Sequence, residues 1–507
     1  MRAFVLILLA AFLNATTVAV AAQPGNPPPY LPSNPLTTDL PSAISSQLPD
    51  LSSTATGILN KQEQYELGYS VMMQMRDQHA LLDDPETAEY IQQIGQRLAS
   101  QSTDGGGYFH YVVPISEEIN SFAVSGGWVF IFTGLITASH TESELAGVMA
   151  HETAHITQNH IARRLQEAQQ TSMTALAGML AAILLGALGG GGGDAIEGGI
   201  IASQGLAAQQ QIDFTRSEEQ EADRVGIEYL AAAGFDPEGM ADFFERLERE
   251  EGVQDSWVPA ILQDHPVDAD RIAEARARAA QFPPTPNTSS PDYYLVRERV
   301  RVLTAPGDED IQRIYAQRIA HGDHNLGTLY GDAVALIQDN KASQAVPILK
   351  KLIAEHGDLH VLYATLGQAQ AKGGQMKDAL ATFRLAMELF PRNIPVTIRY
   401  AQTLMADGKN AQAHDTLLDL FNNVEPTPDQ VELTARAASA AGDLGDAYYY
   451  MGEYQIDSGN LPLAAEQYQL ALRTPHLTGV QRERIAARLK EVRDYLASAR
   501  QEQHESE

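Results

Sequence analysis

The chain of 507 residues contains no cysteine, and this absence removes several kinds of chemistry at once. Disulfides, thiolate metal ligands and cysteine nucleophiles are excluded, so any metal must be held by His, Asp or Glu. Basic residues are also scarce, since 35 Lys and Arg stand against 65 Asp and Glu, for a net charge of -30. This balance argues against a nucleic-acid binder and against electrostatic docking on anionic lipid head groups. The length exceeds what one hydrophobic core supports, so at least two domains are expected.

The N-terminus is typical of a cleavable export signal. An apolar stretch at residues 3–13 follows Met1-Arg2, and small residues precede Gln23. We therefore predict a signal peptide over residues 1–22. An uncleaved membrane anchor is the alternative, but the apolar stretch is shorter than the roughly 20 residues that a spanning helix needs. Residues 23–56 are rich in proline and predict an extended arm.

The next segment predicts helices followed by a small β-sheet. Apolar residues recur with helical spacing over residues 61–100. The pattern then changes to β-branched and aromatic residues at 108–113, 120–124 and 128–132, and Gly126-Gly127 separates the last two runs. Such runs are typical of strands, and the glycine pair is typical of a tight turn between them.

A helix with two histidines carries the strongest functional signal. Thr141 and Glu144 form a capping-box pattern, and the helix that they open contains the H-E-x-x-H motif at residues 151–155. Histidines four residues apart share one helical face, so His151 and His155 can bind one tetrahedral ion. Glu152 can then act as general base on the water that the metal activates. The alternative without function is that the H-E-x-x-H pattern occurs here by chance. His160 lies on a different face of the helix and is interpreted as an ordinary surface residue.

The third ligand separates classes of zinc enzymes. A metzincin needs Gly and His where this chain has Gln158 and Ile161, so that class is excluded. A carboxylate from a later helix is the alternative, and Glu219 and Asp223 share a helical face. Glu219 as ligand and Asp223 as acceptor from a ligand imidazole form a consistent pair. The alternative is that these acidic residues lie in the first turns of a solvent-exposed helix, where the helix dipole favours negative charge.

These motifs together resemble the gluzincin peptidases that include the CaaX prenyl protease and the HtpX heat-shock protease. The resemblance rests on H-E-T-A-H, on E-Q-E-A-D about sixty residues later, and on the strand before the glycine pair. It implies one Zn²⁺ per chain with Glu152 as catalytic residue. The implied ligands are His151, His155 and Glu219, with Asp223 supporting them, and the implied substrate strand is Asn120, Ser121, Phe122 and Ala123. In relatives with a His-Pro after the third ligand, matched here by His265-Pro266, that histidine can occupy the fourth zinc position and silence the site.

The C-terminal part predicts a repeat domain. Ala345, Ala379 and Ala413 are each 34 residues apart, and Phe383 and Tyr468 occupy the aromatic positions typical of tetratricopeptide repeats. We predict an α-solenoid that binds protein, with a purely structural cap as the alternative. The expected fold class is α+β: a mostly helical peptidase domain with a small β-sheet, followed by an all-α solenoid. The expected boundaries are 57–281 for the peptidase, 282–325 for a linker with connecting helices, 326–498 for the repeats and 499–507 for a charged tail.

An apolar stretch complicates the picture of a simple soluble enzyme. Residues 175–206 are mostly apolar with a glycine run between. We favour a mobile helical lid or hairpin near the active site that touches membrane or unfolded substrate, over a membrane-embedded protease.

The family resemblance also implies a cellular location and a class of substrate. It implies a periplasmic endopeptidase that degrades outer-membrane β-barrel proteins or assists their assembly, with association with the outer membrane left open. The implied partners are unfolded or stalled outer-membrane proteins and, through the repeats, the β-barrel assembly machinery. The alternative function is a chaperone or scaffold whose protease site is latent.

Overall fold

The computed structural model describes residues 61–102, 109–161, 163, 216–251, 259–286, 288–307 and 309–506. The predicted export signal, proline-rich arm and apolar stretch at 175–206 lie outside these residues. Within the described residues, no helix combines the length and apolar character needed to cross a membrane. The chain divides into two compact units, one of residues 50–361 and one that includes residues 362–507.

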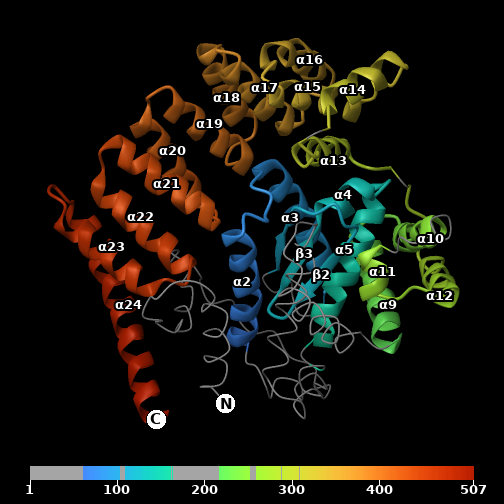
Figure 1. Ribbon diagram of the computed structural model, residues 1–507, viewed down its shortest axis with the longest axis horizontal. Helices are drawn as coiled ribbons and strands as arrows, with labels where there is room; N and C mark the ends of the chain where they lie inside the picture. The colour runs from blue at the N-terminus through green and yellow to red at the C-terminus, as the bar shows by residue number, and fades with distance from the viewer. Residues whose placement is uncertain are drawn as a thin grey trace, which may run out of the picture. The chain divides into compact units, whose positions relative to one another are not determined.

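Helices dominate both units, and Figure 1 labels them in chain order. The first unit contains α2 (Lys61–Asp77), α3 (Pro85–Ala99), β1 (His110–Val112), β2 (Ser121–Val124), β3 (Trp128–Ile131), α4 (Thr133–Ala138), α5 (Glu142–Thr157), α9 (Arg216–Ala232), α10 (Gly239–Glu251), α11 (Ala260–Asp264), α12 (Ala269–Ala279), α13 (Pro291–Leu303), α14 (Ile311–Ala320), α15 (Leu326–Gln338) and α16 (Ala342–Glu355). The boundary between the units falls near the start of α17 (His360–Lys372). The second unit continues with α18 (Met376–Leu389), α19 (Ile394–Ala406), α20 (Asn410–Phe421), α21 (Pro428–Ala441), α22 (Leu444–Asp457), α23 (Leu461–Arg473) and α24 (Gly479–Ser506).

The three strands form one small sheet in the order β1-β3-β2. β1 runs parallel to the central strand β3, whereas β2 runs antiparallel to it, with Phe122 opposite Phe130. Every residue of β3 is buried, and its side chains alternate between two clusters. Val129 and Ile131 join the core that includes α3 and α5, whereas Trp128 and Phe130 join the core of α2. Helices therefore cover both faces of the sheet, with α2 and α5 on opposite sides in Figure 1.

Helix α5 carries the H-E-x-x-H motif and lies at the centre of the first unit's core. The Thr141 side chain accepts a hydrogen bond from the Glu144 backbone N–H, and the Glu144 carboxylate accepts one from the backbone N–H of His140. All residues from Glu142 to His155 are buried, because α5 packs against α3, α9, α10 and β2. Gly147 lies against the backbone of Met240, so a larger residue there would push α10 away. The H-E-x-x-H motif is thus held on a rigid, buried helix.

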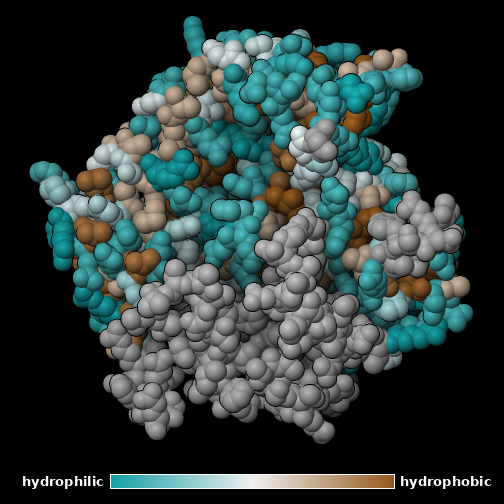
Figure 2. All heavy atoms as spheres, viewed as in Figure 1, coloured by the Kyte–Doolittle hydropathy of each residue, from teal (hydrophilic) through white to brown (hydrophobic). Residues whose placement is uncertain are grey.

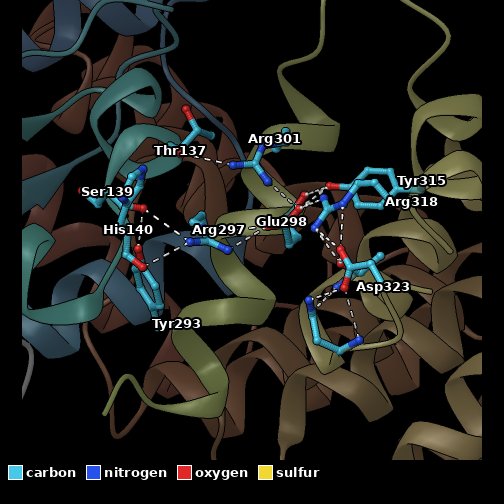
Figure 3. A network of polar contacts seen from close by, with 12 residues as sticks. Thr137, Ser139, His140, Tyr293, Arg297, Glu298, Arg301, Tyr315, Arg318 and Asp323 are labelled. Carbon is cyan, nitrogen blue, oxygen red and sulfur yellow. Dashed lines mark hydrogen bonds and ion pairs between the residues drawn. The ribbon is translucent and has the colours of Figure 1, made fainter. Parts of the chain in front are cut away.

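A polar network joins the peptidase core to the helices that follow it (Figure 3). Glu298 on α13 accepts hydrogen bonds from Arg301, Tyr315 and Arg318. Arg301 also donates to the backbone oxygen of Thr137 on α4. Through these contacts α13 fastens α14 to the peptidase domain.

The C-terminal helices have the packing expected of tetratricopeptide repeats. Neighbouring helices in the chain pack against one another, as α19 with α20 and α22 with α23. A Cβ atom on Gly367 would collide with the ring of Phe383, and one on Gly452 would collide with Tyr468. Glycine on one helix therefore leaves room for the aromatic ring of the next. The predicted fold class, a mostly helical α+β domain with a small sheet followed by an α-solenoid, is confirmed.

Candidate metal centre

Helices α5 and α9 bring together the three residues that the sequence proposes as metal ligands. His151 and His155 project from one face of α5, with their Nε2 atoms 2.9 Å apart. The Glu219 carboxylate on α9 lies 3.5 Å from Nε2 of His151 and 3.4 Å from Nε2 of His155. All three residues are at most 2% exposed. Their ligand atoms, together with one from His265, lie within 4.8 Å of one another.

The donor atoms fit a small tetrahedral cation. Ligands about 2.05 Å from a tetrahedral zinc ion are separated by roughly 3.3 Å from one another. The separations between His151, His155 and Glu219, and those from His265 to His151 and Glu219, range from 2.9 to 3.5 Å. Two imidazole Nε2 atoms directed at the same point are compatible with a cation between them. Burial would raise the pKa of Glu219, but the neighbouring His265, His151 and His155 hold it well below its usual range, so this ligand is anionic.

Asp223 and Arg271 support these ligands. Asp223 Oδ1 lies 2.9 Å from Nδ1 of His151, so Nε2 of that ring faces the other candidate ligands. Arg271 on α12 donates from Nε to Asp223, at 2.6 Å, and its NH1 lies 2.8 Å from Glu219. Burial would raise the pKa of Asp223, but Arg271 and His151 lower it. The role of Arg271 was missed at the sequence level, because α12 reaches the site only through the fold.

The interpretation of His160 as a surface residue is wrong. Its side chain is completely buried, and its Nδ1 lies 2.9 Å from Nδ1 of His155. A continuous helix would have placed position 160 on another face, but α5 ends at Thr157 and the chain turns back. The spacing of five residues after His155 was visible in the sequence, whereas the turn was not.

Glu152 lies beside the ligand cluster rather than within it. It is 1% exposed, and its Oε1 accepts a hydrogen bond of 2.7 Å from the hydroxyl of Ser121 on β2. His265 follows α11 and is also buried, with Nδ1 2.9 Å from Glu219 and Nε2 3.6 Å from Glu152. The Glu152 carboxylate and the His265 imidazole, a fourth candidate ligand, thus both lie at the candidate metal position.

The predicted substrate strand lies along the same site. Ser121, Phe122 and Ala123 belong to β2, and Asn120 immediately precedes it. Asn120 donates from Nδ2 to Asp264, the residue before His265. The turn that carries His265 is therefore fastened to the start of β2. Within the described residues, β2 pairs only with β3, so it is an edge strand.

Comparisons with known proteins agree with this geometry. Residues 85–279 match the model of Peptidase family M48. The chain is 31% identical over 455 residues to a putative beta-barrel assembly-enhancing protease of Vibrio cholerae, covering 88% of this chain and 92% of the relative. It is also 31% identical over 454 residues to the beta-barrel assembly-enhancing protease of Escherichia coli, covering 88% and 91%. The metalloprotease LoiP of Escherichia coli is 27% identical over 196 residues, which are 38% of this chain and 72% of LoiP.

The fold, the ligand cluster and these matches define a metalloendopeptidase. The chain belongs to the beta-barrel assembly-enhancing proteases within peptidase family M48. The family resemblance drawn from the sequence motifs is therefore confirmed.

Proposed function

We propose that this chain is a periplasmic zinc endopeptidase that degrades outer-membrane β-barrel proteins or assists their assembly. The observation that carries the proposal is the convergence of His151, His155 and Glu219 with Glu152 beside them. Two imidazole nitrogens, a carboxylate oxygen and no thiolate favour zinc over harder or softer metals. The names of the relatives support the choice of client.

The surrounding residues have separate tasks in peptide hydrolysis. When bound, zinc supplies Lewis acidity, which polarises a carbonyl and lowers the pKa of water. Glu152 takes the proton from the attacking water and delivers it to the leaving amine. Ser121 holds one oxygen of Glu152 in place. Within the part of the chain that the structure describes, β2 pairs on one side only, and its other edge offers backbone groups to an extended substrate segment, which would bind as an added strand.

His265 acts in this proposal as a latch. Three protein ligands leave one tetrahedral position for water, whereas four ligands fill the site. His265 Nδ1 lies 3.3 Å from Nε2 of His151 and 2.9 Å from Glu219, which supports its role as the fourth ligand at rest. Activity then requires displacement of the turn that follows α11.

The repeats recruit the substrate or the assembly machinery. Apolar residues reach the surface over α22 and α23 (Figure 2). Leu444 on α22 and Leu463 on α23 are 45% and 41% exposed, and Val480 at the start of α24 is 78% exposed. Large exposed apolar side chains on a repeat scaffold are suited to contact with another protein.

The decisive test compares Glu152→Gln and Glu219→Ala in the full chain. Glu152→Gln should keep one zinc per chain but lower cleavage of an unfolded β-barrel protein by about 10²- to 10⁴-fold, because the general base is lost. Glu219→Ala should lose the zinc. The exposed Glu117→Gln is the matched control and should retain both properties. A Glu152→Gln chain that cleaves normally would refute the mechanism.

The alternative function is a chaperone or scaffold with a latent protease site, and the position of His265 inside the cluster favours it. Expressing variants in cells that lack the protein distinguishes the scaffold function from the protease function. If Glu152→Gln restores outer-membrane integrity as well as the wild type, the scaffold function is the important one. If it does not, proteolysis is required.

Replacing His265 tests the latch. His265→Ala should increase the rate of cleavage, because it opens the fourth ligand position. The exposed His321→Ala should leave the rate unchanged. Unchanged or lower activity of His265→Ala would count against the latch.

A further inference from the structure

The chain leaves the path of the metal-binding helix directly after that helix ends. Helix α5 ends at Thr157, and Asn159 adopts a left-handed conformation with φ of 55°. Asn is one of the few residues that occupy this region readily. The turn carries His160 back toward the last turn of α5, where its side chain is fully buried. A histidine is thus brought behind a proposed metal ligand by local backbone geometry.

A continuous series of polar contacts starts at His155 and ends at the surface. Nδ1 of His155 lies 2.9 Å from Nδ1 of His160, and Nε2 of His160 lies 3.2 Å from Oε2 of Glu221. Arg163 donates from NH2 to the same oxygen at 3.1 Å. Glu221 belongs to α9, two residues beyond Glu219. The series therefore connects the two helices that supply the metal ligands.

The proton positions in this series follow from the metal-facing atom. Because Nε2 of His155 faces the other ligands, its lone pair must be available there, and the ring proton then lies on Nδ1. That proton is donated to Nδ1 of His160, so His160 carries its own proton on Nε2. This proton is donated in turn to Glu221. Every donor in the series has an acceptor in this arrangement.

We propose that His160 is a positioning residue that fixes the tautomer and ring orientation of His155, with Glu221 as its anchor. The inference rests on the proposed zinc site and deepens it. Asp223 supports His151 by direct contact, whereas His155 is supported through an intervening imidazole. Partners that hold the far nitrogen of a ligand imidazole contribute to metal affinity as well as to ligand geometry.

Zinc release from the full chain tests this role. His160→Phe keeps the ring but lacks both nitrogens, so zinc transfer to a competing chelator should be about 10- to 100-fold more favourable than for wild type. His160→Gln should recover most of the loss, since its amide can accept from His155 and donate to Glu221. Glu221→Ala should weaken binding in the same direction, and its side chain is 34% exposed, so the fold should tolerate it. The exposed His321→Phe is the matched control.

A second measurement distinguishes positioning from simple packing. In zinc-loaded protein with ¹⁵N-labelled histidine, NMR should show a proton on Nδ1 of His155 in the wild type and in His160→Gln. Loss of that tautomer in His160→Phe, together with faster zinc release, supports the proposal. Wild-type zinc retention in His160→Phe, or equal loss in the phenylalanine and glutamine variants, overturns it. Failure of the wild type to bind zinc would instead refute the proposed metal site.

Discussion

Glu298 provides a quantitative test of how the peptidase domain is joined to the helices that follow it. Its carboxylate is fully buried and accepts hydrogen bonds from Tyr315 and Arg318 of α14 and from Arg301 of its own helix (Figure 3). Burial alone would raise the pKa of Glu298, but Arg301 and Tyr315 more than offset this and hold it at about 2. Relative to an ordinary value of 4.5, this shift corresponds to about 3 kcal/mol of stability at pH 7.

The sign of the pH dependence follows from the lowered pKa. The stabilisation is complete above about pH 4.5 and is lost as the pH falls toward 2. Glu298→Gln should therefore lower the free energy of unfolding by about 3 kcal/mol at pH 7, but by only about 1.4 kcal/mol at pH 3.

Urea unfolding followed by tryptophan fluorescence can measure this effect. Trp128, one of the two tryptophans of the chain, lies in β3 of the first unit, so its fluorescence reports the unfolding of that unit. The exposed Glu355→Gln should show no comparable loss and serves as the control. A loss below 1 kcal/mol at pH 7, or one that does not shrink between pH 7 and 3, would refute the reasoning.

Three further substitutions address the site and the repeats. Asp223→Ala should weaken zinc binding by about 10- to 100-fold in chelator competition, because His151 loses its supporting carboxylate; unchanged affinity would contradict this. Ser121→Ala should lower kcat by roughly 10- to 100-fold at unchanged zinc content, because Glu152 loses a hydrogen bond to a charged group; a change in KM alone would argue against it. Gly452→Leu should lower the stability of the second unit by about 1–3 kcal/mol in thermal unfolding, since its side chain would collide with Tyr468, and an unchanged Tm would disprove the close approach.

Local signals were enough to predict the framework of the site. The capping residues and the H-E-x-x-H spacing define a helix with both histidines on one face, and the structure has that helix as α5. The four-residue spacing of Glu219 and Asp223 likewise predicts a shared face, and both side chains lie at the cluster. These patterns are readable because helical periodicity fixes which side chains point together.

The remaining contacts depend on features that periodicity does not encode. His160 contacts His155 because the left-handed conformation of Asn159 takes the chain off the path of α5. Arg271 follows Asp223 by 48 residues, and its contact depends on how α12 packs against α9. An isolated arginine in an amphipathic helix gives no sequence signal for such a role.

The buried charges of the candidate metal site predict that metal binding stabilises the fold of the first unit. Glu152, Glu219 and Asp223 are buried carboxylates, and Arg271 is a buried cation beside two of them. Their formal charges sum to -2, which a divalent ion would neutralise; without it, burial opposes a charge on His151, but Asp223 and Glu219 raise its pKa to about 9, so this imidazolium offsets only part of the buried charge, and uncompensated buried charge is costly. Removing the metal with a chelator should therefore lower the unfolding temperature reported by tryptophan fluorescence.

The second unit provides the internal control for that experiment. Helices such as α22 and α23 lie in it and contribute none of these carboxylates. Limited proteolysis after chelation should therefore cut the first unit while fragments of the repeat helices persist. Once the free metal concentration exceeds its Kd, each further tenfold increase in that concentration should add about 1.4 kcal/mol to the stability of the first unit. A chain whose first unit unfolds at the same temperature with and without chelator would show that protons or rearranged side chains neutralise the buried carboxylates equally well, and the charge argument would then fail.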